Sequence, residues 1–346
     1  MTEAIKILTS NWHVPYIYNL AKLKQYQFDV ISFRNKLAGR DWYQGYRTIP
    51  DNVHHIAIDS PQWLELINQQ KYNLVIMHSV YDIDAFEKVN APKVMVFHNS
   101  FFTEFRNIHP SQFAEQRLQV KQKLIRANIK PIFISQWKQQ SWELDGIIVN
   151  PGIDTVSEFP YSYQGIEPKI LRACSNFKHR DFMNGYIISN QCCTGFYNIL
   201  LGEGNNLNDF QKEFTQLGQS QNFEQLKAIY SNLRLFCSTN IDNYEDSYNL
   251  ASLEAAAIGM PIIAFSHSSS IWQDGIHGAV SDDIGYLRLR IQQFLQDRQE
   301  SIEKGKQARQ LILQLFPLSL FLNNWSNVIL SLSLSKKNII HFSHLK

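Results

Sequence analysis

Two acidic residues, Asp246 and Glu254, stand eight positions apart where the chain changes from a loop into a helix. Ser247 is the expected N-cap of this helix, so Asp246 lies just outside an N-terminus that favours anionic ligand groups. Glu254 lies two turns further on, where a carboxylate can accept hydrogen bonds from two hydroxyls of a ribose or a hexose. Acidic residues at the start and in the middle of a helix have a purely structural role about as often as a functional one. The spacing alone leaves the structural alternative open.

The sequence around this acidic pair is more specific than its spacing. Residues 246–264, DSYNLASLEAAAIGMPIIA, resemble the E-x7-E segment of retaining glycosyltransferases of the GT-B fold, in the family called glycosyltransferase group 1 or family 4. The flanks agree, because LRLFCST precedes the segment and DGIHG follows it, similar to the family's DG-x-x-G ending. The resemblance implies that Glu254 holds the donor ribose and that Asp246 lies against the donor sugar. It also places four further residues in the donor site: Ser247, Tyr248, Asn249 and Leu250.

Two features depart from the family pattern. The first acid is Asp246, one methylene shorter than the usual Glu, and this change bears on donor choice and on activity. Ser247 and Asn249 replace the glycines that usually follow, and Asn carries a Cβ although it tolerates left-handed backbone. These departures favour a rival interpretation, a non-catalytic scaffold of the same fold that binds a sugar or a nucleotide.

Basic residues follow the first strand that we expect in the second half of the chain. A departing nucleotide diphosphate gains negative charge, and in the family an Arg and a Lys near this strand stabilise it. In the run 169–180, KILRACSNFKHR, the resemblance assigns Arg172 and Lys178 to that role, with Arg180 competing for the second place. A solvated basic turn is the alternative. Gly202, within LLGEGNN, resembles the family's G-x-G loop, although composition alone favours a plain turn.

A candidate acceptor residue, His98, ends an apolar strand expected at 93–98, and Asn99 follows it. Ligand sites of parallel sheets gather at the carboxyl ends of strands. A lone His in this place is more often an ordinary strand-end residue. In related enzymes, however, a His at this strand end projects beside the acceptor and the anomeric carbon, and the resemblance therefore assigns His98 to position the acceptor hydroxyl.

The segment 10–16, SNWHVPY, takes the place of the family's Gly-rich acceptor loop but contains no glycine. The G-x-G-x-x-G turn of an NAD site is therefore missing as well. Ordinary packing at the start of a helix is one interpretation of this segment. In the other, three of its side chains stack on an acceptor ring: Trp12, His13 and Tyr16.

The elements that position these residues fall into two α/β halves. The first 150 residues alternate short β-rich runs with helical stretches, and the apolar runs at 74–77 and 94–97 are typical of parallel strands covered on both faces. A break at 150–168, rich in Pro, Gly, Ser and Tyr, precedes a second alternation that includes an expected helix at 207–217. This pattern predicts two Rossmann-like, doubly wound parallel sheets facing across a cleft, as in the GT-B fold.

The predicted domains follow from this break. Residues 1–155 form an N-terminal acceptor domain, and residues 165–315 form a C-terminal donor domain. Residues 316–346 form a helical segment that crosses back to the first domain. No charged residue lies between Arg309 and Lys336, and this stretch predicts a packed terminal helix pair, with a membrane span or membrane-surface contact as the alternatives.

Composition and small motifs narrow the function classes. Lys and Arg total 33 against 31 Asp and Glu, which gives no support for a nucleic-acid partner. The four cysteines show no C-x2-C spacing, so neither a disulfide framework nor a zinc site is expected. The N-terminus lacks the pattern of a signal peptide, which predicts a cytoplasmic location, with the inner face of a membrane as a peripheral site. Asp82-Ile83-Asp84 matches the D-x-D motif of GT-A enzymes, but the two-domain pattern argues against that fold.

We therefore predict a glycosyltransferase that moves a sugar from a nucleotide-diphosphate donor to a glycan, a lipid-linked or another acceptor. By resemblance the reaction retains anomeric configuration and needs neither a metal nor a cofactor. A nucleotide-sugar epimerase is a further rival beside the binding scaffold. The donor sugar, the nucleotide base, the linkage and the oligomeric state do not follow from the sequence.

Overall fold

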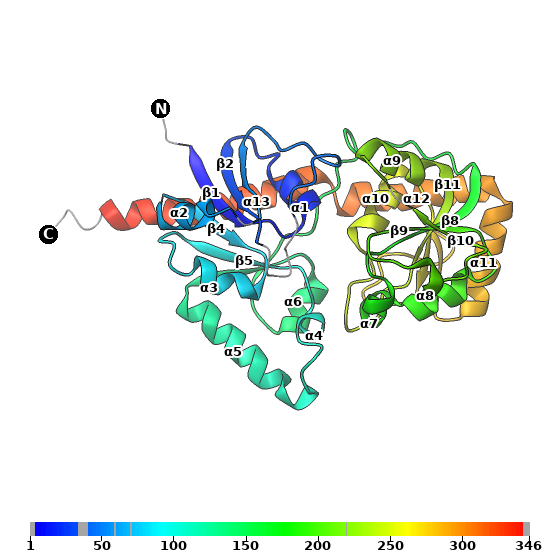
Figure 1. Cartoon of the computed structure of the whole chain (residues 1–346), viewed down its shortest axis with the longest axis horizontal. Helices are drawn as coiled ribbons and strands as arrows, with labels where there is room; N and C mark the ends of the chain where they lie inside the picture. Colours follow the sequence, from blue (N-terminus) through cyan, green and yellow to red (C-terminus); the bar gives the residue numbers. More distant parts are fainter. Residues whose placement is uncertain (1–3, 34–40, 59, 70, 219, 342–346) are drawn as a thin grey trace. The chain divides into compact units, whose positions relative to one another are not determined.

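The chain divides into two compact units, each built on its own sheet (Figure 1). The computed structural model describes residues 4–33, 41–58, 60–69, 71–218 and 220–341, so the last five residues of the segment predicted at 316–346 lie outside the described residues. Unit 1 comprises Met1–Ser100, Phe105–Gly152 and Leu318–Lys346, and unit 2 comprises Phe101–Glu104 and Ile153–Pro317. The chain therefore enters unit 2 twice, first for four residues only.

Unit 1 holds a seven-stranded sheet in the order β3-β2-β1-β4-β5-β6-β7. All neighbouring strands are parallel. Its strands are β1 (Ile5–Ser10), β2 (Tyr26–Ile31), β3 (Val53–Ile56), β4 (Leu74–Met77), β5 (Lys93–Phe97), β6 (Ile129–Phe133) and β7 (Ile147–Ile148). Its α-helices are α1 (Val14–Leu20), α2 (Gln62–Gln69), α3 (Ile83–Phe86), α5 (Phe113–Arg126), α6 (Gln136–Trp142) and α13 (Leu318–His341), and its 3-10 turns are η1 (Val80–Asp82) and η2 (Pro110–Gln112).

The central strands of this sheet explain where a site can form. Every residue of β4 and β5 is buried, as expected for strands covered on both faces. The strand order reverses between β1 and β4, because β2 and β3 extend the sheet on one side while β5 to β7 extend it on the other. Ligands of doubly wound sheets bind outside the carboxyl ends of the strands at such a reversal.

The last helix, α13, belongs to unit 1, where it packs against α1 and β4 (orange to red in Figure 1). Phe321, Trp325 and Ile329 lie in the main hydrophobic cluster of this unit. Their burial explains why this part of the chain carries so few charges. Among the described residues, no helix combines the length and the hydropathy that crossing a bilayer requires.

Unit 2 holds a six-stranded sheet, also parallel throughout, in the order β10-β9-β8-β11-β12-β13. Its strands are β8 (Glu167–Ala173), β9 (Asn198–Leu201), β10 (Thr215–Gly218), β11 (Leu233–Ser238), β12 (Ile262–Phe265) and β13 (Gly278–Ser281). Its α-helices are α4 (Phe101–Glu104), α7 (Asp181–Asn184), α8 (Tyr186–Cys193), α9 (Phe223–Asn232), α10 (Leu250–Ile258), α11 (Ile284–Gln296) and α12 (Arg298–Leu315), and its 3-10 turns are η3 (Lys178–Arg180) and η4 (Leu207–Asp209).

Helix α10 is the most enclosed helix of unit 2. Its residues from Ser252 to Ile258 are all buried, and three consecutive alanines allow neighbouring elements to approach closely. Gly259 ends the helix with φ +109°, the left-handed conformation expected at this position. A Cβ on Gly305 of α12 would lie 1.8 Å from the carbonyl oxygen of Gly259, so α12 crosses the end of α10 at a distance that only glycine permits.

The predicted helix at 207–217 is wrong. In its place stand the short turn η4 and the edge strand β10, which pairs in parallel with β9. Asn206 starts the turn by accepting a hydrogen bond from the backbone N–H of Asn208 at 2.9 Å. Phe210 then packs with Phe177 and Leu200 in a small cluster of its own. Pairing with β9 and this packing override the local helical preference of the segment.

Candidate functional site

The helix that carries Glu254 begins later than predicted. Asn249 is the N-cap of α10, and its side-chain oxygen accepts a hydrogen bond from the backbone N–H of Ser252 at 2.9 Å. The Ser252 hydroxyl accepts one from the Asn249 N–H at 3.0 Å, which completes a capping box. The prediction that Ser247 caps this helix is wrong, because the Ser247 hydroxyl bonds to the Ser269 carbonyl and Asn249 takes the cap position. Glu254 therefore lies just over one turn into the helix.

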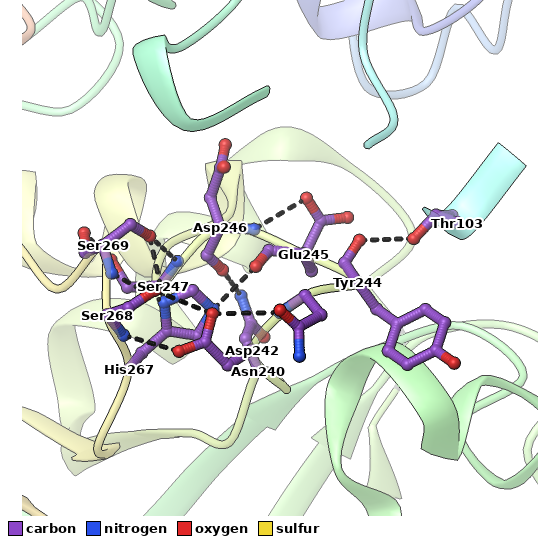
Figure 2. A network of polar contacts seen from close by, with 11 residues as sticks. Thr103, Asn240, Asp242, Tyr244, Glu245, Asp246, Ser247, His267, Ser268 and Ser269 are labelled. Atoms are coloured by element: carbon purple, nitrogen blue, oxygen red, sulfur yellow. Dashed lines mark hydrogen bonds and ion pairs between the residues drawn. The ribbon is translucent and has the colours of Figure 1, made fainter. Parts of the chain in front are cut away.

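The loop of residues 239–249, here called the acid loop, joins β11 to α10 and is fixed by a second loop, the serine loop of residues 266–270 (Figure 2). The backbone N–H of Ser247 donates to the Ser269 hydroxyl at 3.1 Å, and the Ser247 hydroxyl donates to the Ser269 carbonyl at 2.8 Å. Ser247, predicted to bind the donor, thus has its hydroxyl engaged in holding the two loops together.

His267 joins the two loops from inside the protein. Its side chain is 0% exposed, and its Nδ1 accepts the backbone N–H of Ser269 at 3.0 Å. Nδ1 therefore carries no proton, and Nε2 donates to the carbonyl oxygen of Glu245 at 2.7 Å. Two backbone groups set the tautomer of this ring, and the ring in turn fixes the residue before Asp246.

The contact of His267 with the acid loop is supported by Asp242. Its carboxylate accepts the backbone N–H of Ser268 at 2.9 Å and the Ser268 hydroxyl at 2.8 Å. Partial burial acts to raise the pKa of Asp242, but these bonds and one from the Asn243 N–H hold it below its ordinary value. Sequence reasoning missed both His267 and Asp242 as supports of the acid loop. The only signal is a histidine inside a run of serines directly after β12.

Both predicted acids lie in unit 2 and are buried. Asn240 donates to the main-chain carbonyl of Asp246 at 2.7 Å, and Figure 2 shows the Asp246 carboxylate pointing away from the contacts between the loops. Tyr230 of α9 donates its hydroxyl proton to Oε2 of Glu254 at 3.2 Å. Tyr230 is a further residue that the sequence did not single out.

Two residues predicted in the donor site pack into the core of unit 2. Tyr248 and Leu250 both lie against the largest hydrophobic cluster of this unit. The Tyr248 ring meets Phe316 edge-on, with 5.1 Å between ring centroids. Burial, and then the nearby Asp246 and Glu245, raise the pKa of Tyr248, so its hydroxyl stays protonated.

Arg172 is the penultimate residue of β8, near the strand end as predicted, but it is buried, with 1% of the residue exposed. Its guanidinium donates to Asn190 of α8 at 2.8 Å and to Asn198 of β9 at 2.6 Å, and it lies over the Phe210 ring. Arg172 therefore binds two amide side chains inside unit 2 while its Nε has no hydrogen-bond partner among the described residues, and its role at the donor diphosphate stays a prediction.

Lys178 and Arg180 lie beyond the end of β8, in the exposed turn η3. Lys178 forms an ion pair with Asp209 at 2.7 Å. The hydrogen bond to Asp209 and the charge of that carboxylate raise the pKa of Lys178. Both basic residues therefore lie exposed beyond the carboxyl end of β8, and Lys178 pairs there with Asp209.

The loop that contains Gly202 packs directly on the end of β8. Asn205 donates to the carbonyl of Cys174 at 2.7 Å and accepts the backbone N–H of Phe177 at 2.9 Å. Gly202 has φ +131°, and a Cβ there would lie 2.3 Å from the Cys174 carbonyl oxygen. The predicted G-x-G loop thus has a specific structural reason for its first glycine, a close approach between two backbones.

In unit 1, three residues from neighbouring strands form a chain of hydrogen bonds. Thr9 lies near the carboxyl end of β1, His78 follows β4, and His98 follows β5. The Thr9 hydroxyl lies 3.0 Å from Nε2 of His78, and Nδ1 of His78 lies 2.9 Å from Nε2 of His98. Sequence reasoning found His98 but not Thr9 or His78, since only the sheet order makes the three strands adjacent.

The residues predicted to bind the acceptor lie around His98 with different exposures. The Trp12 ring stacks on the His98 ring at 5.7 Å between centroids and is partly exposed. The Tyr16 ring meets His98 edge-on at 4.9 Å but is buried, and its hydroxyl accepts from Nε1 of Trp325 at 3.1 Å. His13 is exposed beside them. Trp12 and His13 can therefore contact a ligand directly, whereas the buried Tyr16 packs against His98 from the protein interior.

The main chain after His98 is also fixed. Lys138 donates to the carbonyl oxygen of His98, and Trp142 donates to that of Asn99 at 2.9 Å. Burial lowers the pKa of His78 to about 3. Burial is also the main cause that holds the pKa of His98 well below its ordinary value, followed by His78, His13 and Lys138. Both rings are therefore neutral near pH 7.

The two acids of the D-x-D motif lie in different environments. Asp82 is buried, and its Oδ2 accepts the Ser10 hydroxyl at 2.6 Å and the backbone N–H groups of His78 and Ser79 at 3.0 and 3.2 Å. Asp84 has 81% of its side chain exposed. Asp82 therefore shapes the turn after β4 and holds His78 in place. Within the described part of the chain, no group of three or more His, Cys, Asp or Glu side chains is arranged to hold a metal ion.

Comparisons with known proteins are informative only at the level of structure. No protein family model matches the chain, and no curated protein matches it in sequence. HepE from Anabaena, solved in complex with UDP and glucose, matches with a TM-score of 0.68 and 14% identity over 95% of this chain and 100% of HepE. The sucrose-phosphate synthase of Thermosynechococcus elongatus matches with a TM-score of 0.66 and 14% identity over 95% of this chain and 99% of the synthase.

TarM is a longer relative in structure. It matches with a TM-score of 0.60 and 15% identity over 77% of this chain, which spans 57% of TarM. Its Staphylococcus aureus form has been solved as a G117R mutant in complex with fondaparinux, α-GlcNAc-glycerol and UDP. Together with the two parallel sheets, these matches show that the chain has the GT-B fold, and the predicted fold class is confirmed.

Proposed function

We propose that this chain is a glycosyltransferase that takes a sugar from a nucleotide-diphosphate donor bound by unit 2. The observation that carries the proposal is the strand, loop and helix at 233–258, which bury Asp246 and Glu254 on a GT-B fold that spans 95% of the chain in two comparisons. The structures of HepE contain UDP or UDP-glucose, so UDP-sugars are the first donors to test.

In this proposal Glu254 binds the ribose hydroxyls of the donor. A carboxylate accepts several hydrogen bonds, and one of them comes from Tyr230, which orients the Glu254 side chain. The first turn of α10 presents backbone N–H groups and the positive end of a helix dipole. That end favours phosphate groups, and Asp246 precedes it on a loop that the serine loop holds in place.

Lys178 and Arg180 are proposed to stabilise the diphosphate as it leaves. Their exposed positions in η3 and their charge support this role. Gly202 brings its loop against the same strand end and allows close backbone approach. Arg172 has no part in the proposal, because its guanidinium is bound inside the unit.

His98 is proposed to orient the hydroxyl of the acceptor, with Trp12, His13 and Asn99 beside it. The aromatic faces of Trp12 and the exposed His13 suit a sugar ring of a glycan or lipid-linked acceptor. Retention of anomeric configuration, independence of metal and a cytoplasmic location with peripheral membrane contact are parts of the same proposal. NMR of the product tests the anomeric configuration, activity assays in the presence of a metal chelator test independence of metal, and cell fractionation tests the location.

The first experiment incubates the purified chain with UDP-, GDP- and ADP-sugars and measures nucleotide release with and without glycan acceptors. We expect release with at least one donor. Glu254→Gln keeps the shape of the side chain but removes its charge, and we expect release about 100-fold slower, since charged hydrogen bonds contribute roughly 1.5–3 kcal/mol each. Glu303→Gln, on the exposed face of α12, is the matched control and retains the wild-type rate.

The outcomes separate the rival functions. Donor binding with no release, across the panel and with all acceptors, contradicts catalysis and supports a binding scaffold. Conversion of the sugar within an intact donor, with no acceptor product, supports an epimerase. Equal release by Glu254→Gln and the wild type removes the donor role of Glu254.

A further inference from the structure

The hydrogen-bond chain Thr9, His78 and His98 links the interior of unit 1 to its candidate acceptor site. β1, β4 and β5 are adjacent in the sheet, so side chains at their carboxyl ends lie in a row. The two joining distances are 3.0 Å from Thr9 Oγ1 to His78 Nε2, and 2.9 Å from His78 Nδ1 to His98 Nε2. His78 is 2% exposed, whereas His98 is partly exposed.

Each neutral imidazole has one N–H and one bare nitrogen, so the two rings share one proton along the line between them. In one arrangement His98 Nε2–H donates to His78, and His78 Nε2–H donates to Thr9. In the other, Thr9 donates to His78, and His78 Nδ1–H donates to His98. The state of the Thr9 hydroxyl therefore decides which nitrogen of His98 carries the proton.

Two contacts favour the first arrangement. The Thr9 hydroxyl has a second acceptor within reach, the carbonyl of Ser10 at 3.4 Å, and a proton directed there leaves the Thr9 oxygen to accept from His78 Nε2 at 3.0 Å. Lys138 places an ammonium on the carbonyl oxygen of His98, and Nδ1 is by covalent structure the ring nitrogen nearer to the main chain. The ammonium acts on the His98 ring, and a positive charge on the main-chain side of that ring favours a lone pair on the nearer nitrogen over an N–H group.

The ring of His98 is also clamped against turning over. Trp12 stacks on one face with an interplanar angle of 14°, and Tyr16 meets it edge-on at 85°. A half-turn of the ring about its Cβ–Cγ bond would put Cε1 in the place of Nε2 and would break the hydrogen bond to His78. The proton, not the orientation of the ring, is therefore the variable.

We propose that Thr9 and His78 are positioning residues that hold His98 as the Nε2–H tautomer, with the Nδ1 lone pair presented as a hydrogen-bond acceptor. The consequence for catalysis rests on the proposed function. A hydroxyl that donates to Nδ1 keeps its oxygen lone pairs for attack on the donor sugar. A hydroxyl that accepted from an Nδ1–H group would lose one of those lone pairs to the hydrogen bond.

The tautomer is read directly by long-range 1H–15N NMR on protein labelled with [15N]histidine, which has 11 histidines to resolve. His98→Gln and His78→Gln identify the two rings by loss of their signals. In the wild type we expect a protonated Nε2 and a bare Nδ1 on His98. A protonated Nδ1 on His98 in the wild type overturns the proposal, and this result needs no variant of Thr9.

Two variants of Thr9 test the origin of the tautomer. Thr9→Val has nearly the same shape but no hydroxyl, and His78 Nε2–H then lacks its acceptor. We expect both rings to change to the Nδ1–H form, whereas Thr9→Ser keeps the wild-type signals. An unchanged His98 in Thr9→Val, with His78 still bonded to it, contradicts the proposal.

The kinetic test uses the same variants with the donor found above. We expect Thr9→Val to lower kcat about tenfold with little change in the donor KM, and Thr9→Ser to restore kcat to within about twofold. Failure of the two proposals is distinguishable. If the wild type transfers no sugar but shows the expected tautomers, the proposed function fails alone. If it transfers sugar and Thr9→Val changes neither tautomer nor kcat, the role of Thr9 and His78 fails alone.

Discussion

In unit 1 the candidate histidine directly follows a strand, whereas in unit 2 the candidate aspartate lies in a loop between β11 and α10. His98 is held by the stacked ring of Trp12, the edge-on ring of Tyr16 and a hydrogen bond to the buried His78. Asp246 is held through its neighbours Glu245 and Ser247, which bind to His267 and Ser269 of another loop. Neither the acid loop nor the serine loop contains a helix or a strand to fix it.

This difference has a physical consequence. The sheet positions a side chain at a strand end. Such a side chain moves only if the buried packing around it changes, and its hydrogen bonding changes only if a proton moves. A loop without secondary structure depends on individual hydrogen bonds and on backbone shape. We therefore expect unit 2 to be sensitive to loop substitutions, and the site in unit 1 to be sensitive to acid.

The largest effect is expected at the loop that contains Gly202. Gly202→Ala adds a Cβ at 2.3 Å from the Cys174 carbonyl at a φ of +131°, and the neighbour is backbone that cannot move away. We expect the free energy of unfolding to fall by about 2–4 kcal/mol. Denaturant unfolding followed by tryptophan fluorescence measures this loss.

Gly195 provides the control for this prediction. It also has positive φ, at +78°, and is also exposed, but a Cβ there meets nothing within 4 Å. Gly195→Ala should cost only about 1 kcal/mol, the cost of the left-handed conformation itself. Equal losses in the two variants would show that the contact with Cys174 contributes nothing.

The next effect concerns the link between the two loops of unit 2. His267→Ala removes one bond to Glu245 and one from Ser269, and we expect nucleotide release about 10–100-fold slower, from about 1.5–3 kcal/mol of lost positioning. His267→Gln can again donate to the Glu245 carbonyl and should recover part of the rate. Steady-state kinetics with the active donor provide the measurement, and a wild-type rate in His267→Ala would show that the acid loop holds its shape without this ring.

The last effect is measured as a slope and tests the acid sensitivity of unit 1. Burial lowers the pKa of His78 to about 3, so between pH 6.5 and 3 the unfolded chain binds a proton that the folded ring does not accept. Unfolding free energy therefore decreases as pH falls through this window, by about 1.4 kcal/mol per pH unit from this group. Denaturant unfolding of the wild type and of His78→Gln, between pH 6.5 and 4.5, should show the shallower slope in the variant. Identical slopes would exclude this contribution.

Much of the fold could be predicted from the sequence because the apolar runs are local. The continuous apolar strands at 74–77 and 94–97 indicated a sheet covered on both faces, and β4 and β5 are buried throughout. The helix predicted at 207–217 failed for the opposite reason, since pairing of β10 with β9 outweighed local preference. The predicted start of α10 was wrong because the cap depends on the reciprocal bonds between Asn249 and Ser252 and not on the residue type at position 247.

The residue types and order along the chain were sufficient to determine the parallel α/β architecture and to single out Asp246, Glu254 and His98. Hydrophobic periodicity and short motifs are written in consecutive residues, so no partner is needed to recognise them. The tertiary structure alone decided that Arg172 is bound inside unit 2, that His267 fixes the acid loop, and that Thr9 and His78 stand in line with His98. Those roles depend on which strands and loops become neighbours, and the separations of 22 and 69 residues between the bonded partners leave no local pattern in the sequence.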